Sequence, residues 1–157
     1  MSILWKVQIN FLNKMNKKLY IGCAITHVPE DKKVEFSKMI EKIKAELKDD
    51  FKILEFWNAL STEHYSIGTP QDVYSYDIKE CLMNADGMLA ICDYYGLGLG
   101  YELGVAVEKK GIPVLAMAHK DSLVSRLIRG IDHPNFKFMT YNSPEEISKQ
   151  ARIFFSN

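Results

Sequence analysis

The sequence has no excess charge of either sign and no long apolar run. Twenty lysines and arginines balance twenty aspartates and glutamates over 157 residues, so the formal net charge is zero. No overall field therefore draws the chain to a nucleic acid polymer or to an anionic membrane surface. No apolar run approaches the roughly 20 residues that cross a bilayer. We expect neither nucleic acid nor membrane as a partner, although a local anion site remains compatible with this composition.

Cysteine and histidine are also sparse. The three cysteines, Cys23, Cys81 and Cys92, form no CxxC pair and have no histidine at ligand spacing. Each lies in a stretch typical of a strand or helix interior, so we expect core side chains in a reducing, cytoplasmic compartment. No metal site and no cofactor are predicted. Among the four histidines, His27 is placed to line a site, since it follows the first predicted strand.

What the sequence does contain is a regular alternation of strand-like and helix-like segments. Its 47% hydrophobic residues suffice for the core of one domain. Alternation of this kind predicts an α/β fold with a doubly wound parallel sheet and helices on both faces. The expected strands cover residues 18–25, 51–57, 86–92, 112–117 and 136–141. The expected helices cover residues 29–48, 69–85, 101–107, 121–128 and 143–155.

Residues 1–16 stand apart from this alternation. Their apolar residues recur with strand periodicity, which predicts an N-terminal extension ahead of a domain at 17–157. The extension is interpreted as an edge strand, an oligomer contact or a disordered segment before a natural start near Met15. A basic start and a small-residue cleavage site are missing, so a signal peptide is not expected.

A glycine-rich stretch, residues 96–104, follows the third predicted strand and contains Glu102. Gly96, Gly98 and Gly100 permit positive φ and close approach of a ligand. We expect Glu102 at a helix N-terminus, where the helix dipole favours the ionised form that a nucleophile needs. Two alternatives stay open, a glutamate that only stabilises the first helical turn and glycines that only permit close packing. The spacing GxGxxG of dinucleotide sites is absent, because Leu103 and Tyr101 occupy the third glycine position.

A second carboxylate, Asp77, lies at the border of the apolar face of the predicted helix 69–85. Thr69 and Asp72 make a capping box at the start of that helix. In doubly wound sheets ligands bind beyond the carboxyl ends of the strands, where residues 24–28, 57 onward and 93–102 are expected. Two carboxylates at one cleft suit glycosyl chemistry, in which one attacks the anomeric carbon and another group handles the proton of the departing base. The alternative for Asp77 is an ordinary solvated aspartate.

Four motifs in order resemble those of the nucleoside 2-deoxyribosyltransferase superfamily. They are residues 20–25 (YIGCAI), 77–86 (DIKECLMNAD), 96–104 (GLGLGYELG) and 125–130 (SRLIRG). The last two are most similar to the 2'-deoxynucleoside 5'-monophosphate N-hydrolases, and the resemblance spans residues 18–141. It implies a flavodoxin-like, three-layer fold with a five-stranded parallel sheet. It also implies a homo-oligomer that cleaves the bond between sugar and base through a glycosyl-enzyme intermediate.

The resemblance assigns roles to individual residues. Glu102 is the expected nucleophile, and Asp77 the residue that orients the substrate or manages the proton. Ser125 matches the position that reaches into a neighbouring subunit's site, in a homodimer or a higher homo-oligomer. Tyr101 and Asp86 are expected to hold the architecture. The residues expected to bind a nucleoside or nucleotide are Tyr20, Gly22, Ala24, Ile25, Asp93, Gly96, Gly98, Gly100 and Ser125.

Several departures from the family pattern concern the phosphate. Ala24 and Thr26 occupy the places of a serine and an arginine, and Gly96 occupies that of a serine or aspartate. The anion donors that remain are backbone N–H groups, Ser125, Arg126 and Arg129. The sequence therefore predicts N-glycosidic cleavage with water or a second base as acceptor, in nucleotide metabolism or salvage. The alternative is a non-catalytic nucleotide-binding or sensing module. A flavin-binding flavodoxin is disfavoured, because residues 26–30 offer one hydroxyl.

Overall fold

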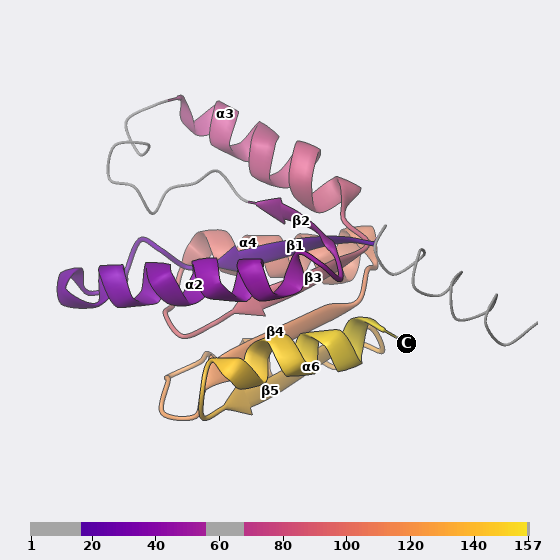
Figure 1. The fold of residues 1–157 in the computed structure, drawn as a ribbon. Coiled ribbons are helices and arrows are strands. Elements are labelled where there is room, and N and C mark those ends of the chain that lie inside the picture. Colours follow the sequence, from indigo (N-terminus) through magenta and orange to yellow (C-terminus); the bar gives the residue numbers. More distant parts are fainter. Residues whose placement is uncertain (1–16, 56–67, 157) are drawn as a thin grey trace, which may run out of the picture.

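The computed structural model describes residues 17–55 and 68–156, which contain one five-stranded sheet (Figure 1). The strand order is β2-β1-β3-β4-β5 and every neighbouring pair is parallel. The α/β class and the doubly wound sheet of five parallel strands are thereby confirmed. The strands are β1 (Lys18–Cys23), β2 (Lys52–Glu55), β3 (Gly87–Ile91), β4 (Val114–His119) and β5 (Phe136–Tyr141).

Helices cover the sheet on both sides. Figure 1 shows α2 (Lys33–Leu47) and α6 (Glu145–Phe155) in front of the sheet and α4 (Leu97–Gly104) behind it. The 3-10 turn η1 (Glu30–Lys32) leads into α2, and α5 (Arg126–Arg129) is a single turn after β4. The other segments are α3 (Pro70–Tyr74), the π-helical η3 (Ser75–Cys81), the 3-10 turn η4 (Leu82–Asn84) and the π-helical η5 (Val105–Lys110).

The core consists of the strand and helix faces that the apolar pattern predicts. All residues of β3 are buried, and so are all but the end residues of β1 and β4, as expected for parallel strands covered on both faces. The predicted stripe of α2 is buried, with Phe36, Ile40, Ile43 and Leu47 facing the sheet side of the core. The three cysteines are free and buried, which confirms the prediction that they pack in the core.

The segment before β3 begins as predicted and then departs from a regular helix. Thr69 Oγ1 accepts a hydrogen bond from Asp72 N at 3.2 Å, and Asp72 Oδ2 accepts one from Thr69 N at 2.7 Å. That confirms the capping box, and the backbone N–H of Thr69 lowers the pKa of Asp72. Beyond Tyr74 the backbone widens into the π turns of η3, where a single α-helix was expected. Such turns are frequent at functional sites.

The predicted extension at residues 1–16 and most of the predicted loop at 58–69 lie outside the described residues. Within 17–55 and 68–156, no helix combines the length and the apolar character that crossing a membrane requires. The sheet topology places the carboxyl ends of β1 and β3 next to each other, at the point where the strand order reverses. That edge is where the fold positions a ligand.

Candidate active site

Glu102 lies in the second turn of α4, not in a glycine-rich turn before a helix. The helix begins at Leu97 with Gly96 as its N-cap, so Gly98 and Gly100 are helical. Gly96 has extended backbone (φ −168°, ψ 138°), and the positive-φ glycines of the described chain are Gly68 and Gly111. The positive φ that glycine permits at residues 96, 98 and 100 is therefore not used there. Leu99 and Leu103 are buried one turn apart, and this helical stripe outweighs the low helix propensity of the glycines.

The carboxyl group of Glu102 fits into a slot against β1. A Cβ placed on Gly22 would lie 2.8 Å from Glu102 Oε2, 3.0 Å from Met88 Cε and 3.4 Å from Leu99 Cδ1. Although part of Glu102 reaches solvent, its Oε2 is buried and accepts no hydrogen bond from any described residue. Glycine at position 22 is therefore what leaves room for this carboxyl group.

Two further polar side chains lie beside the slot. Tyr20 comes from β1, and its buried hydroxyl is the donor that lies toward the Glu102 carboxyl group, close enough to act on its pKa but outside the geometry of a formed hydrogen bond. Asp77 comes from η3 and is partly buried next to the buried Ile78. The charges of Glu102 and Asp77 both add to the burial that raises the pKa of Tyr20. β1, η3 and α4 thus bring Tyr20, Asp77 and Glu102 close to one another. This arrangement argues against the alternative that Asp77 is an ordinary solvated aspartate.

The electrostatics of the slot favour the protonated form of Glu102. Burial raises its pKa to about 8, the negative charge of Asp77 adds to the rise, and the Tyr20 hydroxyl opposes it. The expectation that the helix dipole keeps Glu102 ionised is therefore wrong. The dipole effect fades within the first helical turn, whereas desolvation acts on the whole buried carboxyl group. Near neutral pH the Glu102 carboxyl group therefore holds its proton beside Asp77.

Five other predicted residues lie at the start of α4 and just after β1. A Cβ placed on Gly96 would lie 2.9 Å from Ala24 Cβ, so the chain after β1 and the N-terminus of α4 touch. No atom lies within 4 Å of a Cβ placed on Gly98 or Gly100, so there is space beside both positions, which lie on different sides of the helix. The structure thus brings Ala24 and Gly96 together and leaves open space at the other two glycines. Ile25 is partly buried against the core beside them.

Asp93 and Ser125 are placed differently from these residues. Ser125 is the N-cap of α5, and its Oγ accepts a hydrogen bond from Leu127 N at 3.2 Å. It also lines a mainly apolar cavity of about 100 Å³ beside Gly96 and Gly100. Asp93 follows β3 and accepts hydrogen bonds from Tyr141 Oη and from His119 N, the latter at 2.6 Å.

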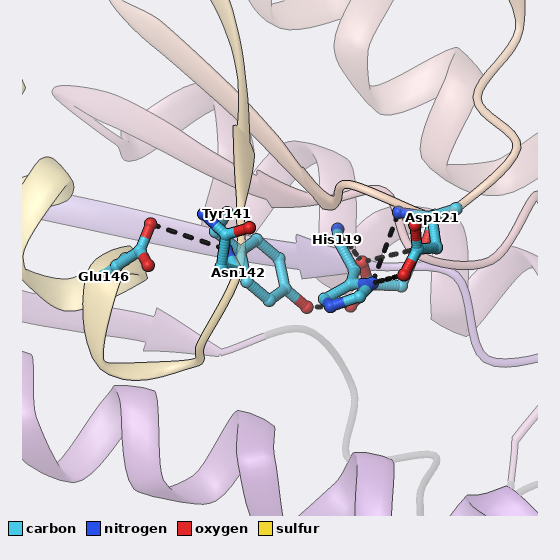
Figure 2. Close-up of polar contacts among 7 residues, drawn as sticks. His119, Asp121, Tyr141, Asn142 and Glu146 are labelled. Carbon is cyan, nitrogen blue, oxygen red and sulfur yellow. Dashed lines mark hydrogen bonds and ion pairs between the residues drawn. The ribbon is translucent and has the colours of Figure 1, made fainter.

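The partners of Asp93 are residues that the sequence analysis missed. Tyr141 ends β5 and His119 ends β4, and in the view of Figure 2 Tyr141 lies on one side of His119 and Asp121 on the other. The sequence could have indicated both residues, because each lies at or just beyond the carboxyl end of a predicted strand. They line a cavity of about 500 Å³ together with Asp93, Tyr94 and Asn142.

Comparison with known proteins bears on the predicted resemblance. No family model matches the chain. A curated protein of Thermofilum pendens bears the name "Putative 2'-deoxynucleoside 5'-phosphate N-hydrolase 1" and is 38% identical over 80 residues. The predicted resemblance is confirmed. The match covers 50% of this chain, and the chain spans about half the length (54%) of that curated relative.

Two solved structures share the fold. A CMP N-glycosidase of Clostridium botulinum superposes with a TM-score of 0.67 at 16% identity, over 88% of this chain and 100% of that chain. A conserved protein of Enterococcus faecalis V583 superposes with a TM-score of 0.54, also at 16% identity, over 87% and 98% of the two chains. At these identities the likeness shows the fold alone, which agrees with the expected flavodoxin-like architecture.

Proposed function

We propose that the protein cleaves the N-glycosidic bond of a nucleoside or nucleoside 5'-monophosphate, with Glu102 as the nucleophile. The observation that supports this most directly is the Glu102 slot, in which Oε2 is buried beside Asp77 and Tyr20 and accepts no formed hydrogen bond from a described residue. A carboxyl group held in this way, partly buried beside a second acid and only partly solvent-exposed, is typical of a catalytic acid or nucleophile. The names of the Thermofilum pendens relative and of the Clostridium botulinum structural neighbour both denote cleavage of this kind of bond.

The proton accounting follows from the pair of carboxyl groups. In the free protein the pair holds one proton, which Glu102 passes to Asp77 as the substrate enters. The Glu102 oxygen then bonds to the anomeric carbon while the bond to the base nitrogen breaks, and Asp77 gives its proton to the departing base. Water next attacks the anomeric carbon, releases Glu102 and returns a proton to the pair. A second base in place of water makes the same reaction a transfer.

The subunit arrangement is part of the proposal. Around the start of α4 and at α5 the chain exposes large apolar side chains, with Leu97 and Leu123 at 93% and Leu127 at 79% exposure. Exposed apolar side chains gathered in this way are typical of a protein interface. Ser125 lies between two of them, so we assign this surface to a homodimer in which Ser125 approaches the partner's site. Leu127→Glu should halve the mass measured by analytical ultracentrifugation. Val34→Glu, at an exposed position of α2, should leave the mass unchanged.

A non-catalytic nucleotide-binding module is the second candidate. The contact between Ala24 and Gly96 favours it, because it fills with apolar atoms a place near the start of α4 where an anion could otherwise bind. Binding alone, however, gives no reason to bury a carboxyl group against a second one.

The test is base release, followed by chromatography, from nucleosides and their 5'-monophosphates in ribo and deoxy forms, with and without a second free base. We expect release by the parent, loss in Glu102→Ala and retention in Glu108→Gln, an exposed acid further along the same helical segment. Exchange of bases would identify a transferase. Binding without release from any compound would overturn the catalytic proposal and support the sensing module.

A further inference from the structure

A second carboxylate at the same sheet edge, that of Asp93, makes a set of contacts unlike those of Glu102. It accepts hydrogen bonds from His119 N at 2.6 Å, from Tyr141 Oη and, at 3.4 Å, from Ser122 Oγ. Both of its oxygens are thus used by groups of the protein. The donors come from the ends of two strands. His119 is the last residue of β4, Ser122 lies shortly after it, and Tyr141 is the last residue of β5.

These bonds continue the sheet where its backbone ladder stops. The last paired residues of β3 and β4 are Ile91 and Met117, followed by one bond from Cys92 N to Met117 O at 2.7 Å. Asp93 then fastens the chain leaving β3 to the ends of both following strands. The carboxylate therefore fixes the point from which the chain departs toward α4.

The short segment between Asp93 and α4 makes contacts at each of its residues, although Tyr95 is largely exposed. Tyr94 lies edge-on against Phe36 of α2, with ring centroids 5.0 Å apart. Tyr95 stacks on His27 at 4.7 Å, and Gly96 closes on Ala24. Because only Tyr94 and Tyr95 separate Asp93 from the N-cap Gly96, a shift at Asp93 should move the first turn of α4 and with it Glu102.

The slot of Glu102 has little free space, since a Cβ placed on Gly22 would lie 2.8 Å from Glu102 Oε2, 3.0 Å from Met88 Cε and 3.4 Å from Leu99 Cδ1. On this basis, and resting on the proposed function, we propose that Asp93, held by Tyr141 and His119, is a positioning residue that sets the place of the Glu102 carboxyl group. It acts through hydrogen-bond geometry and not through its charge on the substrate.

The role of geometry is separable from that of charge by substitution. Asp93→Asn keeps an oxygen that accepts from His119 N and a side chain of the same shape, whereas Asp93→Ala removes every anchor. Misplacement of a catalytic group on the ångström scale costs on the order of 100-fold in rate. We expect kcat for base release to fall about 10-fold to 100-fold in Asp93→Ala, with KM within about twofold, and to recover most of its value in Asp93→Asn.

Two further variants complete the series. Tyr141→Phe removes one donor and should reproduce part of the fall in kcat if Asp93→Ala does not fold. Asp121→Asn is the matched control, because this exposed acid belongs to the same cluster through His119 but makes no contact with Asp93 in the described chain. Its kcat should equal that of the parent.

A readout that does not need turnover is the titration of the Glu102 side-chain carbon by ¹³C NMR. In Asp93→Ala the slot should open to water and the pKa of Glu102 should fall toward its ordinary value, while Asp93→Asn and Asp121→Asn keep it near the parent's. Absence of turnover in the parent would defeat the proposed function alone, and this titration would still decide the positioning role. An unchanged titration in Asp93→Ala overturns the inference, and so does an equal loss of kcat in Asp93→Asn and Asp93→Ala.

Discussion

Two carboxylates at the carboxyl edge of the sheet have opposite surroundings. Asp93 accepts three formed hydrogen bonds from neighbouring strands and loops, whereas Glu102 Oε2 accepts no formed bond among the described residues and has only the Tyr20 hydroxyl beside it. Burial and Asp77 together raise the pKa of Glu102 to about 8. A buried acid whose oxygens are all satisfied holds the structure together. An acid left without formed hydrogen bonds beside another acid is costly to keep, and that cost is typical of a site that awaits a ligand.

The largest difference between the two carboxylates is expected when each acid is replaced by its amide. Glu102→Gln should lower kcat for base release by at least about 10³-fold, since an amide cannot form the glycosyl ester. Asp93→Asn should keep most of the activity. Measured side by side in the base-release assay, equal losses in the two variants would show that both carboxylates act through their charge.

A smaller effect is expected when the slot is narrowed while both acids are kept. A methyl group at position 22 would meet Glu102 Oε2 at 2.8 Å, so Gly22→Ala should displace the carboxyl group and lower kcat by about 100-fold. The added atom in a packed core should also cost about 1–3 kcal/mol in the free energy of unfolding.

The matched control for that variant is Gly104→Ala, at a helical glycine with no atom within 4 Å of the added Cβ. This change should raise the free energy of unfolding by about 0.5–1 kcal/mol, because alanine is the better helix former. Urea unfolding measures the free energy of unfolding of both variants. A Gly22→Ala protein as active as the parent would show that the space beside Gly22 does not determine the position of the Glu102 carboxyl group.

The smallest expected effect is a dependence of the free energy of unfolding on pH, which would distinguish Glu102 from Asp93. Glu102 binds its proton more tightly in the folded chain, with a pKa near 8 against an ordinary value of 4.5. Between these values the folded state holds more protons than the unfolded state, so stability should fall as pH rises from about 5 to 8. The slope contributed by one such group is at most about 1.4 kcal/mol per pH unit.

Glu102→Gln should remove this slope, as urea unfolding between pH 5 and 9 would measure, and Asp121→Asn should leave it in place. Base release should also decline above about pH 8, where the pair of acids loses its shared proton. A stability curve of the same slope in Glu102→Gln and the parent would mean that Glu102 does not titrate in this range.

Much of the fold was predictable, because its determinants are local. Continuous apolar runs identified the five strands, and the threonine and aspartate at residues 69 and 72 identified the start of α3. The alternation of strands and helices then fixed the parallel sheet and the edge at which ligands bind. The pairing of Asp77 with Glu102 followed from chemistry and from the resemblance, and the structure places both beside Tyr20.

The protonation of Glu102 was not predictable, because it depends on contacts between distant segments. The slot that buries its oxygen is formed by β1, β3 and α4, and no local pattern reports such a fit. The same holds for Asp93, whose donors lie 26 and 48 residues away along the chain. The start of α4 was misplaced because glycine propensity was weighed above the buried leucines at 99 and 103.

The π turns of η3 make the length of the chain itself a determinant of the candidate site. A π turn accommodates one residue more than an α turn over the same rise. Each residue of a helix turns the chain by about 100°. The extra residue therefore determines the direction in which Asp77 points relative to the buried residues Cys81 and Leu82. A chain shortened by one residue between Asp77 and Cys81 would regain a regular helix, and the aspartate would face away from Glu102. The irregular turn is thus retained at the expense of helical regularity, and the second carboxylate owes its direction to it.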